Sequence, residues 1–537
     1  MRNHKIVVYF VIAFSFNNRN VNGAFTMKTK FFKFLCPAMI LFSLASCMQT
    51  KPTTPKDEAV EAHSKLAAMD EEEANAIKEE IKIVGEDAIY GNVYLPSEYD
   101  GATIFWRSSN PDMVSYEDDG DLKAGIVKRG SEDTIVTMKA YIEKDGKGAV
   151  MEQEINVLAA PEELTDDDFK GYMFAHFIGE NGHGTAGEQM YFALAEDGFH
   201  FNDINYKNGQ LQPVLTSTVG EKGVRDPYIC RSHEGDKFFM IATDLSIYNR
   251  GGWGASAGQN ASKQGSYNLI KWESTDLVNW GEPEEIKVAP ENAGMAWAPE
   301  MVYCEETGDY VIFSSSSIVN EARTAKTLPD HIYYVTTRDF KHFSESKPFL
   351  LGQPKNPDTL NYADDGAEDM SDRRIIIDAS VLRVGDYYYC AAKDGDNNEA
   401  NGNIRLFRSE TLFDWRSWEY VTDLDEIGIA PNNSRDGIGK FDNSQLEGPE
   451  LFRFNKQDWE SEDVPEYGIM ADRYMRQDLG YLPFKTTDFE DRKNENGSWS
   501  ILGKNDYSFN GGTYRHGSVM NITEAEMERL KEAYPAK

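Results

Sequence analysis

The sequence predicts an all-β protein in which a five-bladed β-propeller follows a small β-sandwich. Three observations carry this prediction. Aromatic residues, which favour strands, make up 12% of the chain. One hairpin plan recurs between about residues 167 and 522, at intervals of roughly 60–80 residues, a spacing typical of repeat architectures. Ahead of these repeats, residues 83–158 alternate apolar and polar positions between turn signals.

Length and charge narrow the range of functions. The chain of 537 residues is too long for one ordinary domain, so two or three units are expected. Its 55 Lys and Arg against 90 Asp and Glu give a net charge of −35, which argues against nucleic acid as a partner because nucleic acid needs basic patches. The 5 Cys form no C-x-x-C pair and no H-E-x-x-H occurs, so a zinc site is not expected.

The N-terminal segment has the features of an export signal. Residues 27–46 combine Lys residues, an apolar stretch and small residues, and "LASC" ends at Cys47 like a bacterial lipobox. We expect a lipoprotein signal peptide, with lipid on Cys47 as the membrane attachment and export to the periplasm or outer membrane of a Gram-negative bacterium. Residues 1–26 are interpreted as an extra segment ahead of the true start at Met27; the alternative is a lone transmembrane anchor.

The next segment, residues 47–82, predicts a tether and a short charged helix, because it is polar, contains Pro near its start and then carries many Ala, Glu and Lys. Residues 83–160 fit one small β-sandwich. Within them, "IFWRSSNPDMVSYEDDGDLKAG" resembles the bacterial immunoglobulin-like domains attached to secreted polysaccharide-degrading enzymes, with Trp106 as a core residue. The resemblance implies a spacer; glycan binding is the alternative.

Five hairpin units fill residues 166–537. Their third strands are the most alike: "YFALAEDGFHF", "IKWESTDLVNW", "YYVTTRDFKHF", "IRLFRSETLFDW" and "YLPFKTTDF". The turn acids in four of them are expected to cap loops: Asp197, Asp276, Asp339 and Asp488. Because each unit is too small to bury its sheet alone, the five are expected to cover one another around an axis, as in a propeller.

Acidic residues stand near the start of four strands that we expect to line this axis. The four stretches are "GVRDPYI", "AWAPEMV", "IIIDASV" and "LEGPELF". Pro is tolerated at the first residue of a strand, where no ladder donor is needed. We therefore expect Asp226, Glu300, Asp378 and Glu447 to occupy equivalent positions and to gather at one end of the central funnel; the alternative is that each caps its own loop.

Carboxylates that converge on an aromatic-lined funnel suit glycoside hydrolysis. One carboxyl must be protonated to deliver a proton to the leaving oxygen, and another must be ionised, as base for water or as nucleophile. A third carboxylate helps by its position, because a negative neighbour disfavours ionisation of the acid and raises its pKa.

The ordered set "RDP … WAP … IIDAS … LEGP … YRHGSV" resembles the five-bladed propeller hydrolases of glycoside hydrolase family 43. The resemblance implies that Asp226 is the general base, Glu447 the general acid and Asp378 the carboxylate that tunes the acid. It places His516 near the axis, where relatives hold a water or a cation, and Trp297 close to the sugar. It implies no required cofactor, and a structural Ca²⁺ in the channel near His516 is the cation it suggests. Ala379 departs from the family, which commonly has Pro there.

Three further residues are candidates for substrate binding. Trp253 lies in the Gly-rich stretch "NRGGWGASAG" and is expected to stack on a sugar ring, with loop packing as the alternative. Asp244 in "IATDLS" and Glu300 are candidates for hydrogen bonds to sugar hydroxyls. Arg225 is not assigned a role beside Asp226, because neighbouring residues of a strand point to opposite faces.

The expected activity is therefore the removal of terminal sugars from plant-type oligo- or polysaccharides with inversion of configuration. The resemblance suggests α-L-arabinofuranose or β-D-xylose as the sugar. Three alternatives stay open: an exo-β-galactosidase on the same scaffold, a retaining fructosidase similar to family 32, although N-D-P-N-G does not occur, and a glycan-binding propeller without catalysis.

Overall fold

The computed structural model describes residues 55–253, 260–352, 370–394, 403–424, 426–427, 446–474, 481–503, 505–510 and 514–537. These residues belong almost wholly to one compact unit, Ala59–Lys537. The expected signal peptide, the lipid site at Cys47 and residues 1–26 lie outside the described ranges. None of the helices within those ranges is long and apolar enough to cross a membrane.

Two helices open the described chain, α1 (Pro55–His63) and α2 (Glu71–Glu80). Asp70 caps α2 by accepting hydrogen bonds from the first-turn backbone N–H groups of Glu72 and Glu73. We expected a charged, solvated helix here. Instead α2 turns Ala74 and Ile77 into the core of the small β-domain, because these two apolar residues are three apart and share one helix face.

The small domain contains one five-stranded sheet in the order β1-β5-β4-β3-β2. Its strands are β1 (Ala67–Ala68), β2 (Glu98–Tyr99), β3 (Ala102–Ser108), β4 (Thr134–Lys144) and β5 (Lys147–Val157). Alternate residues of β4 are buried, as the period-2 pattern predicts. Trp106 is 3% exposed and donates from Nε1 to the Pro96 carbonyl at 3.0 Å, so it is the predicted core residue.

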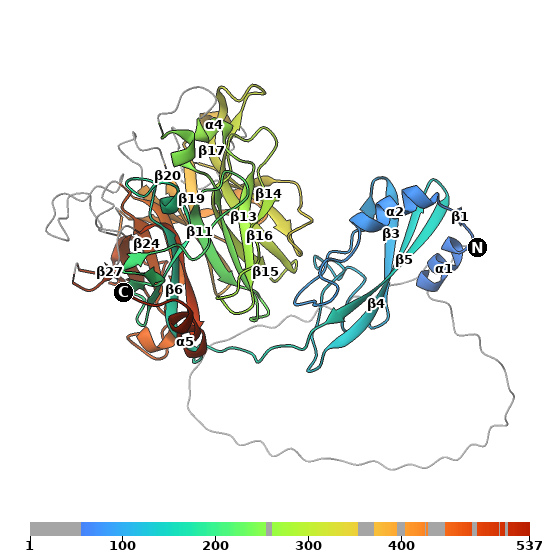
Figure 1. The fold of residues 1–537 in the computed structure, drawn as a ribbon, viewed down its shortest axis with the longest axis horizontal. Coiled ribbons are helices and arrows are strands. Elements are labelled where there is room, and N and C mark those ends of the chain that lie inside the picture. Colours follow the sequence, from blue (N-terminus) through green and yellow to red (C-terminus); the bar gives the residue numbers. More distant parts are fainter. Residues whose placement is uncertain are drawn as a thin grey trace, which may run out of the picture. The chain divides into compact units, whose positions relative to one another are not determined.

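Five sheets follow, and we call them blades I to V (Figure 1). Blade II contains β11 (Val224–Arg231), β12 (Phe238–Asp244), β13 (Asn268–Ser274) and β14 (Glu284–Lys287). Blade III contains β15 (Trp297–Cys304), β16 (Asp309–Val319), β17 (Lys326–Thr337) and β18 (Lys347–Leu350). Blade IV contains β19 (Ile376–Val384), β20 (Tyr387–Asp394), β21 (Asn403–Ser409) and β22 (Glu419–Asp423). Blade V contains β23 (Glu447–Arg453), β24 (Tyr467–Asp472), β25 (Tyr481–Thr486) and β26 (Trp499–Ile501).

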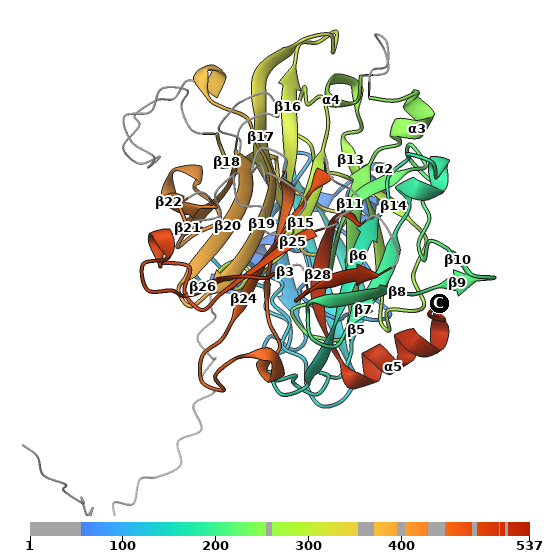
Figure 2. The same ribbon diagram turned by 90° about the vertical axis from the view of Figure 1, so that its left-hand side faces the viewer.

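Blade I is assembled from both ends of the propeller sequence. Its strands are β6 (Phe169–Phe177), β7 (Tyr191–Ala195), β8 (His200–Asp203), β27 (Ser508–Asn510) and β28 (Arg515–Thr523), in the order β27-β8-β7-β6-β28. The late strand β28 pairs antiparallel with β6 and is the innermost strand of the blade (Figure 2). The innermost strands β11, β15, β19, β23 and β28 each contact the next, which closes the ring.

The hydrophobic core is divided among the spaces between blades. Separate clusters of buried side chains fill the spaces between blades I and II, II and III, III and IV, IV and V, and V and I. Each blade therefore buries both faces against its neighbours. Because a fully buried large apolar side chain contributes about 1.5–3 kcal/mol, a single blade removed from the ring would lose most of its stabilisation. The predicted five-bladed propeller is confirmed.

Short elements connect or cover the blades: β9 (Tyr206–Lys207), β10 (Gln210–Leu211), α3 (Ile247–Arg250), α4 (Ala261–Gln264) and α5 (Glu524–Ala533). The turn acids act as predicted from their spacing. Asp197, Asp276, Asp339 and Asp488 each accept a hydrogen bond from the backbone N–H two residues later, and the first three also from the N–H three residues later. They hold the turn after the third strand and lie outside the central cavity.

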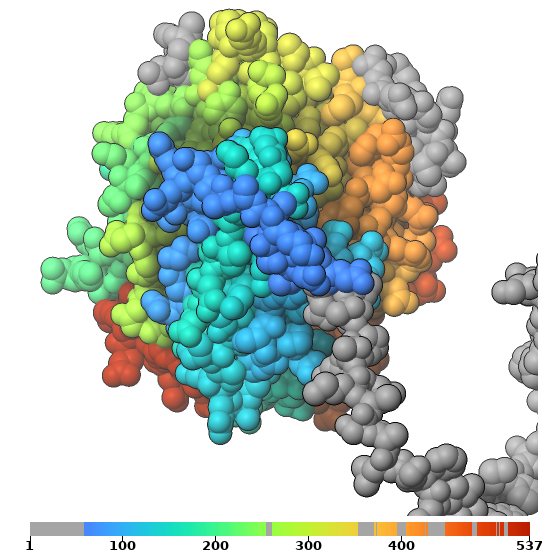
Figure 3. All heavy atoms as spheres, turned by 90° about the vertical axis from the view of Figure 1, so that its right-hand side faces the viewer, coloured from blue at the N-terminus to red at the C-terminus, as the bar shows by residue number. Residues whose placement is uncertain are grey.

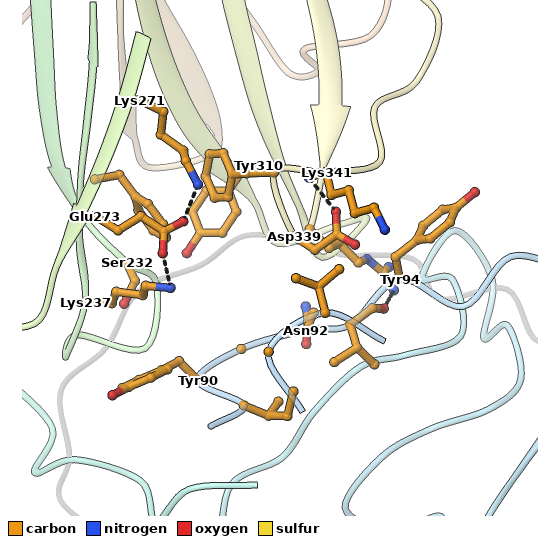
Figure 4. A pocket seen from close by; sticks show the side chains of 18 of the residues that line it. Tyr90, Asn92, Tyr94, Ser232, Lys237, Lys271, Glu273, Tyr310, Asp339 and Lys341 are labelled. Atoms are coloured by element: carbon orange, nitrogen blue, oxygen red, sulfur yellow. Dashed lines mark hydrogen bonds and ion pairs between the residues drawn. The ribbon is translucent and has the colours of Figure 1, made fainter. Parts of the chain in front are cut away.

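Side chains of the small domain contact blades II and III (Figure 3, blue and cyan residues). Arg129 forms a bidentate ion pair with Asp236, and the ring of Tyr94 stacks on His342 at 4.4 Å. A hollow lies beside these contacts, and in it Glu273 bridges Lys237 and Lys271 (Figure 4).

Candidate active site

The five innermost strands share one irregularity close to their first residues. Each has a register shift against its neighbour at the same place, and the shifts lie between Arg225 and Tyr228, Trp297 and Glu300, Ile377 and Ser380, Glu447 and Glu450, and Arg515 and Ser518. A bulge of this kind interrupts the strict alternation of side chains and re-aims the residues within it. The bulge therefore fixes which residues of each blade face the axis.

The second residue of the bulge adopts a left-handed backbone conformation in four blades. The φ angles are +48° at Asp226, +49° at Ala298, +56° at Asp378 and +50° at Gly448. For residues other than glycine this conformation costs about 1–3 kcal/mol and is retained where the surrounding structure demands it. As a result, two consecutive side chains in a blade point into the same cavity.

This cavity has a volume of about 540 Å³ and lies where the bulges of all five blades meet. It is lined by Glu180, Asn181, Arg225, Asp226, Leu245, Trp253, Trp297, Ala298, Asp330, Ile375, Ile377, Asp378, Lys393, Glu447, Tyr474, Arg515 and His516. Its size and its mixture of aromatic, apolar and charged groups suit a small polar ligand. The structure thus brings together most of the residues predicted for the site.

Six predicted residues line the cavity, namely Asp226, Trp253, Trp297, Asp378, Glu447 and His516. Two do not. Asp244 is buried at the end of β12, where it accepts a hydrogen bond from the Glu221 N–H at 2.7 Å, and burial raises its pKa to about 6. Glu300 is buried and accepts from the backbone N–H of Val381 at 3.0 Å.

The expectation that four acids occupy equivalent positions is wrong, and the bulge register gives the reason. We number the positions from the residue at which each register shift begins. Asp226 and Asp378 then occupy the second position, whereas Glu447 occupies the first and Glu300 the fourth. Side chains at the fourth position join neighbouring blades instead. Each accepts from a backbone N–H of the next innermost strand, in the pairs Glu300–Val381, Ser380–Leu451, Glu450–Val519 and Ser518–Ile229.

Asp226 is held by two contacts that leave its carboxylate turned to the cavity. The Thr243 hydroxyl donates to Oδ2 at 2.9 Å, and Nδ1 of His516 lies 3.5 Å from Oδ1. The same Thr243 oxygen accepts from the Ala298 N–H at 2.8 Å, which ties the position of Asp226 to blade III. A carboxylate held in this way can accept a proton from water inside the cavity.

Asp378 is buried next to the start of β23, where Glu447 lies. Its Oδ2 accepts from the Gly448 N–H at 3.3 Å, and its own N–H donates to the Ser315 hydroxyl at 3.0 Å. Burial raises the pKa of Asp378 to about 6, with the negative charges of Glu447 and Asp226 adding to the rise.

Glu447 lies between two cations. Arg515 Nη2 donates to Oε1 at 2.9 Å, and Lys393 Nζ donates to Oε2 at 3.3 Å. Burial alone would raise the pKa of Glu447, but Lys393 and Arg515 outweigh it, so its pKa lies below the usual value in the free protein. This differs from the expectation of a raised pKa, because no motif in the sequence pointed to Lys393 or to the orientation of Arg515.

Arg225 also faces the cavity, contrary to the alternation argument, because the bulge brings two neighbours to one side. Its Nη1 donates to Glu180 and to the fully buried Glu188, both at 3.0 Å. Its guanidinium lies 4.5 Å from the ring centre of Phe177 and 5.3 Å from that of Trp253. Arg225 therefore supports one wall of the cavity.

The reasoning from sequence missed Lys393, Arg515, Asp330, Glu180 and Tyr474. Arg515 could have been found, since it directly precedes His516 in "YRHGSV". The others carry no local signal: Lys393 is the penultimate residue of an ordinary strand, and Asp330 follows Pro329 within the long strand β17.

Among the residues that the structure describes, the side chains around His516 do not supply a set of metal ligands. Across the described ranges, no group of three or more His, Cys, Asp and Glu side chains is placed to hold a metal ion. The His516 ring lies beside the Asp226 carboxylate, whose other oxygen accepts from Thr243, and the backbone N–H of His516 donates to Asp472 at 3.1 Å.

A five-bladed propeller whose axial cavity holds carboxylates from several blades defines a class of carbohydrate-active hydrolase folds. Residues 167–528 match the family described as a probable glycosyl hydrolase domain, related to glycoside hydrolase family 43. The chain belongs to this family, which confirms the resemblance seen in the motifs. Residues 74–160 match the atrophied bacterial Ig domain, which agrees with a core that begins at Met69 and includes α2.

The individual proteins to which the chain is similar share only part of its sequence. An α-L-arabinofuranosidase of Bifidobacterium longum subsp. longum is 29% identical over 422 residues, which cover 73% of this chain and 36% of that protein. The chain thus spans about a third of the length of this relative.

Two of the solved structures to which the chain is similar are carbohydrate-active enzymes. An exo-1,5-α-L-arabinanase from a bovine ruminal metagenomic library has 15% identity and a TM-score of 0.35, covering 59% of this chain and 88% of its own. An endo-1,4-β-xylanase from Bacteroides thetaiotaomicron has 12% identity and a TM-score of 0.38, covering 62% and 91%.

Proposed function

We propose that the protein removes a terminal sugar, α-L-arabinofuranose or β-D-xylose, from side chains of plant-type polysaccharides with inversion of configuration. The observation that carries the proposal is that Asp226 of blade II and Glu447 of blade V, far apart in sequence, line one cavity with Asp378 between them in chain order. The name of the Bifidobacterium relative supports arabinofuranose as the first sugar to test.

In this scheme Asp226 acts as general base. It accepts a proton from a water molecule that attacks the anomeric carbon, while Thr243 and His516 keep the carboxylate in place. Glu447 acts as general acid and delivers a proton to the leaving oxygen. Inversion needs both groups on opposite sides of the sugar, with room for the water.

Asp378 completes the scheme as the carboxylate that orients and tunes the acid. Its hydrogen bond from the Gly448 N–H fixes the backbone directly after Glu447. Its negative charge opposes ionisation of Glu447 and so works against the two cations that hold the acid.

The test is a panel of aryl glycosides, with α-L-arabinofuranoside, β-D-xyloside, β-D-galactoside and fructoside members, followed by NMR of the first product anomer. We expect turnover of one of the first two substrates with inversion. In Asp226→Asn and Glu447→Gln we expect turnover to fall about 10²–10⁴-fold with folding intact. Glu196→Gln, which alters an exposed acid paired with Lys531, is the matched control.

Each alternative predicts a different outcome. Cleavage of the galactoside alone would favour an exo-β-galactosidase on this scaffold, and net retention would favour a fructosidase-like mechanism. Tight binding of an oligosaccharide by calorimetry without released sugar would favour a non-catalytic glycan-binding propeller. Normal turnover in both carboxyl variants would refute the assignment of Asp226 and Glu447.

We further propose that the protein is a lipoprotein anchored through Cys47 in the periplasm or outer membrane of a Gram-negative bacterium. This proposal is supported by the sequence of residues 27–47 alone. Mass spectrometry of the mature N-terminus tests it: a diacylglyceryl group on Cys47 is expected, and an unmodified Cys47 would refute the anchor.

A further inference from the structure

Both carboxylate oxygens of Glu447 are occupied by cationic donors, which is unusual for a group that must carry a proton. Arg515 holds Oε1 at 2.9 Å and Lys393 holds Oε2 at 3.3 Å. The Lys393 side chain is 3% exposed, so its charge is screened little by solvent. This arrangement suits an ionised carboxylate, because both donors bind a negatively charged oxygen more strongly than a protonated carboxyl group.

The two donors are not equivalent. Arg515 is also fixed through Nε by the buried Asp472 at 2.8 Å, which balances its charge and fixes its position. Lys393 reaches the site from β20, and its ammonium lies 4.6 Å from the ring centre of Tyr474. The contact made by Lys393 is the longer one. Protonation at Oε2 therefore disturbs the weaker of the two hydrogen bonds.

We propose that Lys393 is a positioning residue that acts through Glu447: it holds Oε2 in the ionised arrangement and thereby sets the upper pH limit of the hydrolysis. The inference rests on the proposed function, because it requires Glu447 to be the proton donor. It adds a residue from blade IV that has no place in the motifs of the sequence.

Other charged groups also lie near Glu447, and a Lys393 variant leaves their residue types unchanged. Arg515 and His516 of β28 supply positive charge, whereas Asp378 of β19 and Asp472 of β24 supply negative charge. Asp226 of β11 faces His516. A neutral substitution of Lys393 therefore removes one positive charge and changes none of these neighbouring residues.

The direction of the effect follows from the charges. A positive neighbour favours the ionised carboxylate, and Lys393 contributes to the lowered pKa of Glu447. Without that charge Glu447 keeps its proton to higher pH. Because a general acid must be protonated, the alkaline limb of kcat/KM in the free enzyme then moves to higher pH.

The test compares Lys393→Met and Lys393→Gln, which remove the charge, with Lys393→Arg, which keeps it. The measurement is kcat/KM from about pH 3 to about pH 9 on the aryl glycoside that the wild type cleaves. We expect the alkaline limb to move up by about one pH unit in both neutral variants and to stay in place in Lys393→Arg. Lys531→Met, which removes an exposed lysine, should leave the limb unchanged.

An alkaline limb that stays in place in folded neutral variants would overturn the inference while leaving the proposed function intact. Loss of turnover at every pH in those variants would also overturn it, since Lys393 would then be needed for more than tuning. Failure of both neutral variants to fold, measured by circular dichroism, would assign Lys393 to folding instead. Absence of wild-type turnover on every glycoside would refute the proposed function and this inference together.

Discussion

Glu300 and Glu450 form a buried carboxyl pair whose proton should make stability depend on pH. Their side chains are hydrogen-bonded to each other, and both are at most 7% exposed. Burial raises the pKa of Glu450 to about 8, and burial together with the charge of Glu450 raises the pKa of Glu300 well above its usual value. The pair therefore keeps a proton in the folded protein at a pH where the unfolded chain has released it.

The sign of the effect follows from this difference. Stability from the pair is fully present below about pH 4.5, where the unfolded carboxyl also holds its proton, and is lost as pH rises through about 8. The gap between 4.5 and about 8 for Glu450 sets an upper bound of ~5 kcal/mol on that loss.

Glu450→Gln isolates this term. The amide oxygen can still accept from the Val519 N–H, which Glu450 Oε1 now does at 2.8 Å, and the amide NH₂ can donate to Glu300. The variant has no proton to lose at this position. We expect its free energy of unfolding to match that of the wild type near pH 5 and to exceed it by about 2 kcal/mol near pH 8.

Urea unfolding followed by tryptophan fluorescence at the two pH values measures the difference. Glu196→Gln, at an exposed site, serves as the control for loss of a charge. Equal pH dependence in the wild type and Glu450→Gln would show that Glu450 does not hold a proton in the folded protein and would refute the reasoning.

Two further predictions concern the cavity wall and the ring closure. Trp253 is 55% exposed and packs edge-on against Trp297 at 6.0 Å, so Trp253→Ala should raise KM about tenfold with kcat nearly unchanged; a fall in kcat at constant KM in steady-state assays would contradict a binding role. Arg231 pairs with both oxygens of Glu526 at 2.6 and 2.7 Å, which ties β11 to α5, so Arg231→Met should destabilise the protein by about 3 kcal/mol. An unchanged midpoint of thermal unfolding would contradict that prediction.

The repeat pattern predicted the ring because each blade repeats the same order of strand, turn and strand. Asp276 and Asp339 follow their third strands with the same spacing, and both cap the next turn through backbone N–H groups. The order of short motifs also predicted that Asp226, Asp378 and Glu447 lie together, and all three line the cavity. Features that recur along the chain can be recognised from sequence because each copy supports the others.

The geometry of the site depends on features without such support. A bulge shifts the pairing by one residue, so the alternation rule wrongly gave no role to Arg225, which faces the cavity. The place of each acid near the start of its strand grouped Glu300 with Asp226, Asp378 and Glu447, although Glu300 does not line the cavity. Lys393 of blade IV contacts Glu447 of blade V because the two blades pack side by side in the folded ring, although the two residues are far apart in sequence. Local patterns carry no trace of either effect.

The late strand β28 completes blade I and also supplies Arg515 and His516. During synthesis, β6 leaves the ribosome roughly 340 residues before its partner strand and must wait for it with an unpaired edge. A chain interrupted before Arg515 lacks ring closure and two cavity residues together. Loss of ring closure and loss of part of the cavity wall therefore coincide in any product that lacks β28.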